Sequence, residues 1–319
     1  MPTINTTAGT AGQAGSTAAE LINVLKTPML LVPDFDNMLE MYLFEPIPLQ
    51  GGKTIQRNRM ERLGVATSPS QLTEGVAPTP RPGPINSVTA PVEEYGDAVY
   101  FSSLAVLSAK NDLVREAVKI LGLSLKETRD RLLYTVADAA TNTFRVNDRA
   151  NDNAITLGDK LSFEEISEVK GVLRTAGVPF KADGTYHLIV PSAQHQDLAV
   201  DNNWLNANQY AYPGEIRRGT VVMILGVSVF ETNSNSFAAT ASTTTGNSSK
   251  IRSSFICGRE AASVTDLEAT QMHMQARGGG SDWTKRRVQM GWTGVFKAFL
   301  NNQTFLRRIR ASSSDATAV

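Results

Sequence analysis

The longest helical period in the chain covers residues 112–144, and it restricts the possible folds more than any other feature. Asn111 or Asp112 is placed to cap the start of this helix. At about 1.5 Å per residue the helix would be roughly 50 Å long, well above the usual length of a globular helix. We therefore expect a fold arranged around one very long helix. The apolar residues recur at intervals of three, four and seven: Val114, Val118, Leu121, Leu125, Leu132, Val136, Ala140 and Phe144.

Residues 46–95 contrast with this helix because proline and glycine interrupt them repeatedly. Between the interruptions, residues 54–59 alternate in a strand-like manner but are half-polar on both faces. This pattern predicts a long two-stranded excursion from the body of the protein. An isolated hairpin is only marginally stable in water, so the excursion should need a neighbouring surface. The prolines are Pro46, Pro48, Pro69, Pro78, Pro80, Pro82, Pro84 and Pro91.

The rest of the chain mixes helices and strands, so we expect an α+β fold. Residues 1–18 are rich in Thr, Ala, Gly and Ser and can bury little, and short helical pieces follow up to residue 45. Ser162 and Glu165 form a capping-box pattern that opens a helix ending near Ala176-Gly177. The other predicted elements are strands at 95–104, 186–190, 221–230 and 251–257, a short helix at 192–200, a surface loop at 233–249, and a strand pair from 291–300 that turns at Asn301-Asn302 and ends with Phe305, Leu306 and Ile309.

Motifs for enzymatic chemistry do not emerge from the sequence, and we assign no catalytic, cofactor-binding or metal-binding residue. His187, His195 and His273 lack the close spacing of a zinc site. Gly278-Gly279-Gly280 gives backbone freedom without the Lys-Ser/Thr of a phosphate loop, so we interpret it as a hinge. Cys257, the single cysteine, is expected to be a small buried apolar residue within a strand.

Charge argues against a global nucleic-acid-binding surface, because 31 basic residues balance 31 acidic ones. The acid pairs Glu93-Glu94 and Glu164-Glu165 are expected to be solvated or to lie at the start of a helix. No stretch approaches the roughly 20 apolar residues of a membrane span, and the N-terminus does not resemble a secretory signal, so we expect a protein that is soluble and intracellular when made. One basic cluster could be solvated charge, face DNA or pair with acids of a neighbouring subunit: Lys285-Arg286-Arg287 with Arg307, Arg308 and Arg310.

The chain also resembles the N4-like branch of phage major capsid proteins, which has the HK97-like fold. The resemblance spans about residues 20–310, although Asp282-Trp283-Thr284-Lys285 departs from the family pattern. The segments that carry it are Leu72-Thr73-Glu74-Gly75-Val76-Ala77-Pro78, Tyr95-Gly96, Gly184-Thr185-Tyr186-His187-Leu188-Ile189-Val190-Pro191, Asp197-Leu198-Ala199-Val200-Asp201, Gly214-Glu215-Ile216 ahead of Gly219, and Val288-Gln289-Met290-Gly291-Trp292.

This resemblance implies a division of the chain and a structural function. It implies an N-terminal arm at 1–45, an extended loop at 46–95, a peripheral domain with its spine helix at 96–160, an axial domain at 161–264, and a return to the peripheral domain at 265–319. The implied protein self-assembles into hexamers and pentamers of an icosahedral head, the virion capsid, made in the cytoplasm of the host bacterium.

The implied partners are further copies of the chain, decoration or scaffolding proteins, and packaged double-stranded DNA bound without sequence specificity, with no membrane. Some shells of this fold cross-link a lysine to an asparagine, but we interpret Lys53 as an ordinary solvated lysine. Two alternatives stay open from the sequence: an encapsulin-like cellular compartment with the same fold, and a soluble enzyme with its site at 161–264.

Overall fold

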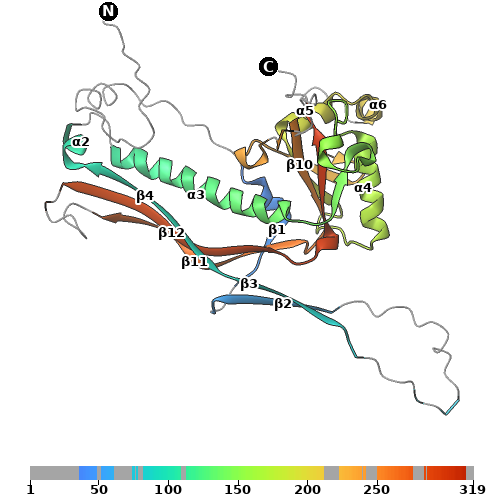
Figure 1. Cartoon of the computed structure of the whole chain (residues 1–319), viewed down its shortest axis with the longest axis horizontal. Coiled ribbons are helices and arrows are strands. Elements are labelled where there is room, and N and C mark those ends of the chain that lie inside the picture. Colours follow the sequence, from blue (N-terminus) through green and yellow to red (C-terminus); the bar gives the residue numbers. More distant parts are fainter. Residues whose placement is uncertain are drawn as a thin grey trace, which may run out of the picture. The chain divides into compact units, whose positions relative to one another are not determined.

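A computed structural model describes residues 36–48, 52–60, 74–75, 77, 82–108, 113–211, 223–238, 240–241, 250–275, 284 and 286–313 (Figure 1). Several predicted features lie outside these residues. They are the arm up to residue 35, the cap at Asn111 or Asp112, most of the loop between residues 61 and 81, the Gly278-Gly279-Gly280 hinge, and Lys285.

Helices and strands lie largely in separate runs along the described chain, as in an α+β fold. The helical elements are η1 (Leu39–Leu43), α2 (Ser103–Ser108), α3 (Leu113–Asp138), η2 (Val146–Asp148), η3 (Asp152–Ala154), α4 (Phe163–Thr175), α5 (Ser192–Ala199), α6 (Asn202–Ala211), η4 (Asn235–Phe237) and η5 (Gln303–Phe305). The strands are β1 (Phe44–Pro46), β2 (Thr54–Met60), β3 (Ile85–Pro91), β4 (Glu93–Ser102), β5 (Thr143–Arg145), β6 (Tyr186–Pro191), β7 (Met223–Ile224), β8 (Val227–Thr232), β9 (Thr240–Ala241), β10 (Lys250–Cys257), β11 (Ala262–Gln275), β12 (Arg287–Leu300) and β13 (Leu306–Ser312).

The described residues fall into two compact units. The smaller unit contains Gly96–Leu125 and Gln271–Thr293, and the larger unit contains Phe35–Tyr95, Lys126–Thr270 and the chain from Gly294 onward. The elements α3, β4, β11 and β12 contribute residues to both units.

The long helix is present as α3, but it is shorter than the sequence period predicts. It has 26 residues and ends at Asp138, so the predicted extension to Phe144 is wrong. The chain leaves the helix through Thr141 and Asn142, which hydrogen-bond to Gln303, and Phe144 lies in β5 beside Ile309 of β13. Phe144 matches the apolar period of the predicted helix, but it is buried as part of a strand and not as part of the helix.

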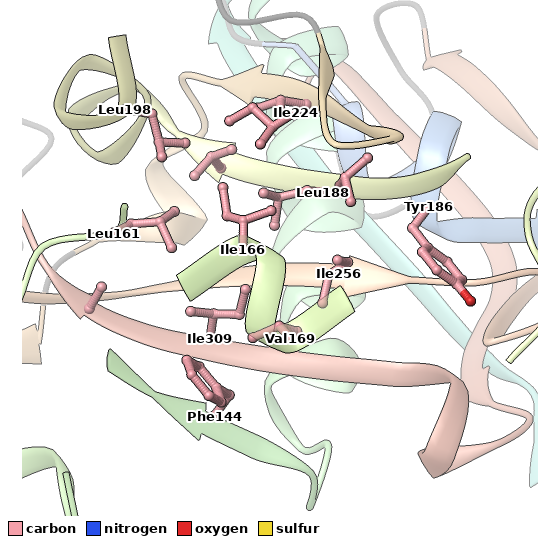
Figure 2. Close-up of a cluster of buried hydrophobic side chains, with 14 of the residues drawn as sticks. Phe144, Leu161, Ile166, Val169, Tyr186, Leu188, Leu198, Ile224, Ile256 and Ile309 are labelled. Carbon is pink, nitrogen blue, oxygen red and sulfur yellow. The ribbon is translucent and has the colours of Figure 1, made fainter. Parts of the chain in front are cut away.

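A seven-stranded sheet forms the centre of the larger unit, in the order β5-β13-β10-β6-β8-β7, with β9 also pairing to β10. Helix α4 covers one face, and Figure 2 shows its Ile166 and Val169 directed toward Leu188, Ile256 and Ile309 of the sheet. Ser162 caps α4 by accepting a hydrogen bond from the Glu165 N–H at 3.4 Å, which confirms the predicted helix start. Two strands of this sheet, β5 and β13, lie outside residues 161–264, the range expected for the axial domain.

The opposite face of this sheet carries a second apolar core. Strand alternation places Ile189, Phe255 and Cys257 there, and the C-terminal half of α3 packs against them through Leu133 and Ala137. Residues of η1 and β1 join the same core, so this core also fixes the segment that leads into the residue 46–95 region. The predicted strands at 186–190 and 251–257 are therefore confirmed, and both lie in the interior of the seven-stranded sheet.

The predicted strand pair after residue 291 is wrong in its pairing, although both strands exist. β12 belongs to a four-stranded sheet of order β1-β11-β12-β4, whereas β13 pairs with β10 and β5 in the seven-stranded sheet. The connection is pinned by Asn301, whose side-chain amide donates to the Glu260 carbonyl and the Ser263 hydroxyl. An apolar alternation specifies a strand but not its partner, so the sequence suggested a hairpin.

Three smaller predictions also need correction. The strand predicted at 95–104 runs from Glu93 to Ser102 and gives way to α2, which contains Leu104. The described part of the β-rich stretch at 221–230 consists of β7 and β8 joined by a tight turn at Leu225-Gly226, both with positive φ. The predicted loop at 233–249 contains η4 and β9, and its Phe237 is fully buried.

Candidate assembly surfaces

The hairpin formed by β2 and β3 is the two-stranded element predicted within residues 46–95. Its strands are antiparallel, pair from Thr54↔Pro91 to Met60↔Ile85, and belong to neither larger sheet. At the base of the hairpin, Ile55 and Ala90 are buried with Phe299. At the other end, the cross-strand pair Met60 and Ile85 is 75% and 63% exposed. Burial therefore falls along the hairpin, and its outer described end presents apolar side chains to solvent.

Lys53 lies at the base of this hairpin, immediately before β2. It is exposed, and its carbonyl accepts a hydrogen bond of 2.8 Å from the Val92 N–H. Its backbone therefore adds one hydrogen bond at the end of the β2–β3 pairing.

In the smaller unit, two glycines allow β4 and β12 to approach unusually closely. A Cβ atom on Gly96 would lie 2.8 Å from the Trp292 carbonyl oxygen, and one on Gly291 would lie 2.8 Å from the Asp97 carbonyl oxygen. Both contacts are closer than real Cβ atoms tolerate, so these positions require glycine. A hollow of about 630 Å³ lies over this crossing, with His273 and Thr293 among its lining residues.

Other apolar side chains are exposed on the smaller unit. Leu104 and Leu107 of α2 are 66% and 71% exposed, and Met274 of β11 is 61% exposed. Large exposed apolar patches are typical of interaction surfaces. The described part of the smaller unit therefore presents candidate contact residues of its own.

Arg129 of α3 holds three segments of the larger unit together. Its guanidinium donates to Glu40 at 2.9 Å and to both carboxylate oxygens of Asp266 at 2.9 and 3.1 Å. The same group lies 4.9 Å from the centroid of the Phe296 ring. The forked guanidinium suits this geometry, because it can serve two carboxylates and a ring face at once. Sequence inspection missed this residue, since its acidic partners are far away in the chain.

Two arginines of the predicted basic cluster are engaged inside the fold. Arg308 forms an ion pair with Asp138 at 3.0 Å, and Arg310 forms one with Asp152 at 2.8 Å. Arg310 is buried, and it also donates to the Ser253 hydroxyl at 2.7 Å. Arg287 lies far from them in sequence and stacks over the Tyr100 ring at 5.2 Å. The solvated-charge interpretation is therefore wrong for Arg308 and Arg310, which neutralise carboxylates of their own chain.

The three histidines occupy separate environments. His187 contacts Asp183 and the Tyr42 carbonyl, His195 lies 3.4 Å from Glu231, and His273 lies 2.9 Å from the Thr293 hydroxyl. Cys257 is fully buried in β10, as predicted, and burial raises the pKa of its thiol to about 11. A thiol with so high a pKa stays protonated and is a poor nucleophile.

The acid pairs at 93–94 and 164–165 each include one residue with defined partners. Hydrogen bonds from Tyr95 and Lys297 lower the pKa of Glu93, while burial and this same contact raise the pKa of Tyr95 to about 12. Burial raises the pKa of Glu165, which accepts a hydrogen bond from the Asn147 N–H at 3.0 Å. Glu164 and Glu165 also lie in the first turn of α4, which confirms the expected helix-start position for that pair.

Asp130 is a buried acid that no sequence pattern pointed to. It is 1% exposed on α3, its Oδ2 accepts a hydrogen bond from the Ser234 hydroxyl, and burial raises the pKa of its carboxyl.

Within the described residues, no cluster of three metal-ligating side chains occurs. The described helices also include none that is long and apolar enough to cross a membrane.

Comparison with known proteins identifies the family. The family model described as phage capsid protein matches residues 86–297, which is most of the chain. No curated protein matches in sequence. The capsid of cyanophage Pam1 is 14% identical with a TM-score of 0.74, and the match covers 98% of this chain and 100% of that one.

Two further solved capsids show the same fold. The capsid of cyanophage P-SCSP1u is 12% identical with a TM-score of 0.68, covering 90% of this chain and 91% of that one. The capsid of Ralstonia phage GP4 is 12% identical with a TM-score of 0.64, covering 99% of each chain. At these identities the structures establish a shared fold, and it is HK97-like over nearly the full length.

These matches exclude the enzyme alternative, because the family is structural and non-enzymatic. They also place the protein in the virion, as part of a bacteriophage capsid. The chain belongs to the phage capsid protein family, and its function is that of a major capsid protein, the structural subunit of a tailed-bacteriophage head.

Proposed function

We propose that this capsid protein belongs to the N4-like branch and forms a head of hexamers and pentamers in which residues 46–95 lie over an adjacent copy. The observation that carries this proposal is the exposed outer end of the β2–β3 hairpin. Met60 and Ile85 face each other there, and both remain mostly in water within a single chain. Burying such side chains against another copy is favourable by roughly 1.5–3 kcal/mol for each large side chain.

The proposed parts follow the family division. Residues 1–45 act as an arm, 96–160 and 265–319 form the peripheral domain, and 161–264 form the axial domain. Residues 96–160, 161–264 and 265–319 all contribute strands to one sheet, through β5, through β6 and β10, and through β13. This shared sheet supports a close association of the peripheral and axial domains. Permanent interfaces of this kind commonly bury more than about 2,000 Å², which a single hairpin and a few apolar patches from each copy would help to supply.

Packaged double-stranded DNA is a proposed partner at the inner face, without sequence-specific contacts. The formal net charge of zero supports weak, non-specific contact, because a large positive field would bind the genome tightly. Decoration or scaffolding proteins are further proposed partners. An encapsulin-like compartment is the rival role for the same fold, and a co-purifying cargo enzyme would favour it.

The test of the hairpin's role is deletion of residues 52–90, replaced by a short Gly/Ser linker, in the protein expressed alone. We expect closed particles to disappear from negative-stain micrographs, while the subunit elutes as a small, folded species in size-exclusion chromatography. The loss of Ile55 and Ala90 from the contact with Phe299 should cost the body little, because most of its core lies elsewhere.

Substitution at the base of the hairpin provides the control. Lys53→Gln keeps the backbone bond to Val92 and alters only an exposed side chain, so normal shells are expected. Normal shells from the deletion variant would refute the role of the hairpin in assembly.

A further inference from the structure

His187 of β6 places both of its ring nitrogens against hydrogen-bond acceptors. Nε2 lies 2.8 Å from Oδ2 of Asp183, and Nδ1 lies 3.0 Å from the backbone carbonyl oxygen of Tyr42. Tyr42 belongs to η1, which leads directly into β1 and then toward the hairpin. One side chain therefore connects the seven-stranded sheet to the segment from which the hairpin departs, and all of these residues lie in the larger unit.

The chemistry of imidazole makes this arrangement depend on protonation. A neutral imidazole has one N–H donor and one acceptor nitrogen, whereas the imidazolium has two donors. The neutral form at His187 would direct a lone pair at either a carboxylate or a carbonyl oxygen. The charged form can donate to both. We propose that His187 is a proton-controlled clasp, which as an imidazolium holds Tyr42 against the sheet and as a neutral ring releases it.

Two acidic side chains and one lysine lie around the clasp. Lys181 contributes one positive charge and pairs with Glu45 at 3.2 Å, while Asp183 contributes a second negative charge. Hydrogen bonds from His187 and Thr185 outweigh burial and lower the pKa of Asp183, so this carboxylate stays ionised. The imidazolium balances the negative charge that remains.

Neutral groups complete the surroundings of the clasp. Phe230 of β8 has its ring centroid 5.0 Å from that of His187 and stacks on Tyr42 at 3.6 Å. From β10, the Cys257 thiol donates to the same Tyr42 carbonyl at 3.8 Å. The Glu260 N–H donates to Glu45 at 2.9 Å and holds that carboxylate in place. These contacts pack around the ring of His187 and the carbonyl oxygen of Tyr42.

Histidine is the side chain that ordinarily changes charge between pH 5 and 8. The clasp is therefore suited to hold residues 38–46 more firmly in mild acid than in mild alkali. The inference deepens the proposed role of the hairpin, but the geometry of the clasp involves one chain only. Its test can therefore avoid shell formation altogether.

The test is hydrogen–deuterium exchange of the full-length subunit, followed by mass spectrometry of peptides covering residues 38–46. After correction for intrinsic exchange, we expect protection in the wild type to be about tenfold lower at pH 8.5 than at pH 5.5, since a charge-assisted hydrogen bond is lost. Asp183→Asn should remove this difference. Its amide can donate to a neutral Nε2 while Nδ1–H still donates to Tyr42, so the clasp closes at both pH values.

Two further variants separate the clasp from other titrating groups. His187→Gln cannot change charge and should show no pH difference at residues 38–46. His273→Gln, altered in the smaller unit, should behave as the wild type. A flat wild-type profile, or the same pH difference in Asp183→Asn as in the wild type, would overturn the proposal. Normal shells from the residue 52–90 deletion, together with the expected exchange profile in the wild type, would count against the hairpin's role alone.

Discussion

At the scale of single residues, several charged side chains each hold two or more segments together. Arg129 is 13% exposed at its side chain and pairs with two carboxylates, while Asp159 is 2% exposed and accepts hydrogen bonds from three residues. Removing one member of a pair costs more when the other member is buried, because a buried charge is then left without compensation.

Replacing Arg129 with Met should destabilise the subunit by about 1–3 kcal/mol, because Glu40 and Asp266 lose their shared cation and Phe296 loses its stacked neighbour. Urea unfolding of the isolated subunit measures this change. The matched control is Lys119→Met on the same helix, which breaks an exposed pair with Glu116 and should cost less than about 0.5 kcal/mol. Equal effects of the two changes would contradict the assignment.

Asp159 should give the subunit an acid-dependent stability. Burial raises the pKa of its carboxyl, but hydrogen bonds from Arg149, Thr156 and Asn147 outweigh burial and hold the pKa at about 2. Because this pKa lies below the ordinary 3.8, the stabilisation is full above about pH 4 and is lost as pH falls toward 2.

Asp159→Asn should therefore cost roughly 2 kcal/mol at pH 7, and its stability curve should converge with that of the wild type near pH 2. Denaturant titrations at a series of pH values would show this convergence. A constant difference across the whole range would mean that the charge of Asp159 is not what stabilises the fold.

At the scale of elements, the four-stranded sheet depends on glycines where β4 and β12 cross. The segments Tyr95-Gly96 and Gly291-Trp292, which carry part of the family resemblance, lie far apart in sequence. In the structure Gly96 of β4 lies against the backbone of β12, and Gly291 of β12 lies against the backbone of β4. A side chain at either position must push the strands apart.

Gly291→Ala should destabilise the subunit by about 1–3 kcal/mol, because its Cβ would meet the Asp97 carbonyl oxygen at 2.8 Å. Gly122→Ala in α3 is the opposite case, since nothing lies within 4 Å of its Cβ position. That change should stabilise the helix by about 0.5–1 kcal/mol. Thermal melts of the two variants should shift in opposite directions, and a shift of the same sign would contradict the close-approach explanation.

At the scale of the whole molecule, this chain combines a well-packed body with apolar side chains that remain exposed. The two cores of the seven-stranded sheet are complete within one chain, whereas the outer end of the hairpin is not buried. The formal net charge of zero adds no long-range repulsion between copies, so short-range burial can dominate association.

The double substitution Met60→Ser with Ile85→Ser should therefore leave subunit stability within about 0.5 kcal/mol of the wild type but reduce the yield of closed shells. Unfolding curves and negative-stain microscopy of the same preparations measure the two effects. Leu157→Ser, which alters another exposed apolar residue outside the hairpin, is the matched control and should assemble normally. Full shell yield from the double variant would exclude these side chains from the interface.

The sequence by itself determined the elements whose signals are local. The Ser162 cap, the apolar strands at 186–190 and 251–257 and the alternating strand at 54–59 all formed where residue spacing and capping chemistry placed them. These patterns can be recognised without knowing which distant segments pack together, because a helix cap or an alternating strand face is defined within a few neighbouring residues.

Only the tertiary structure decided which distant segments meet. It ended α3 at Asp138 by drawing Phe144 into the sheet, and it separated β12 and β13 into different sheets. It also brought His187, Asp183 and Tyr42 together. A strand edge or a charged side chain accepts many partners of suitable chemistry, and the packing of the whole core selects among them.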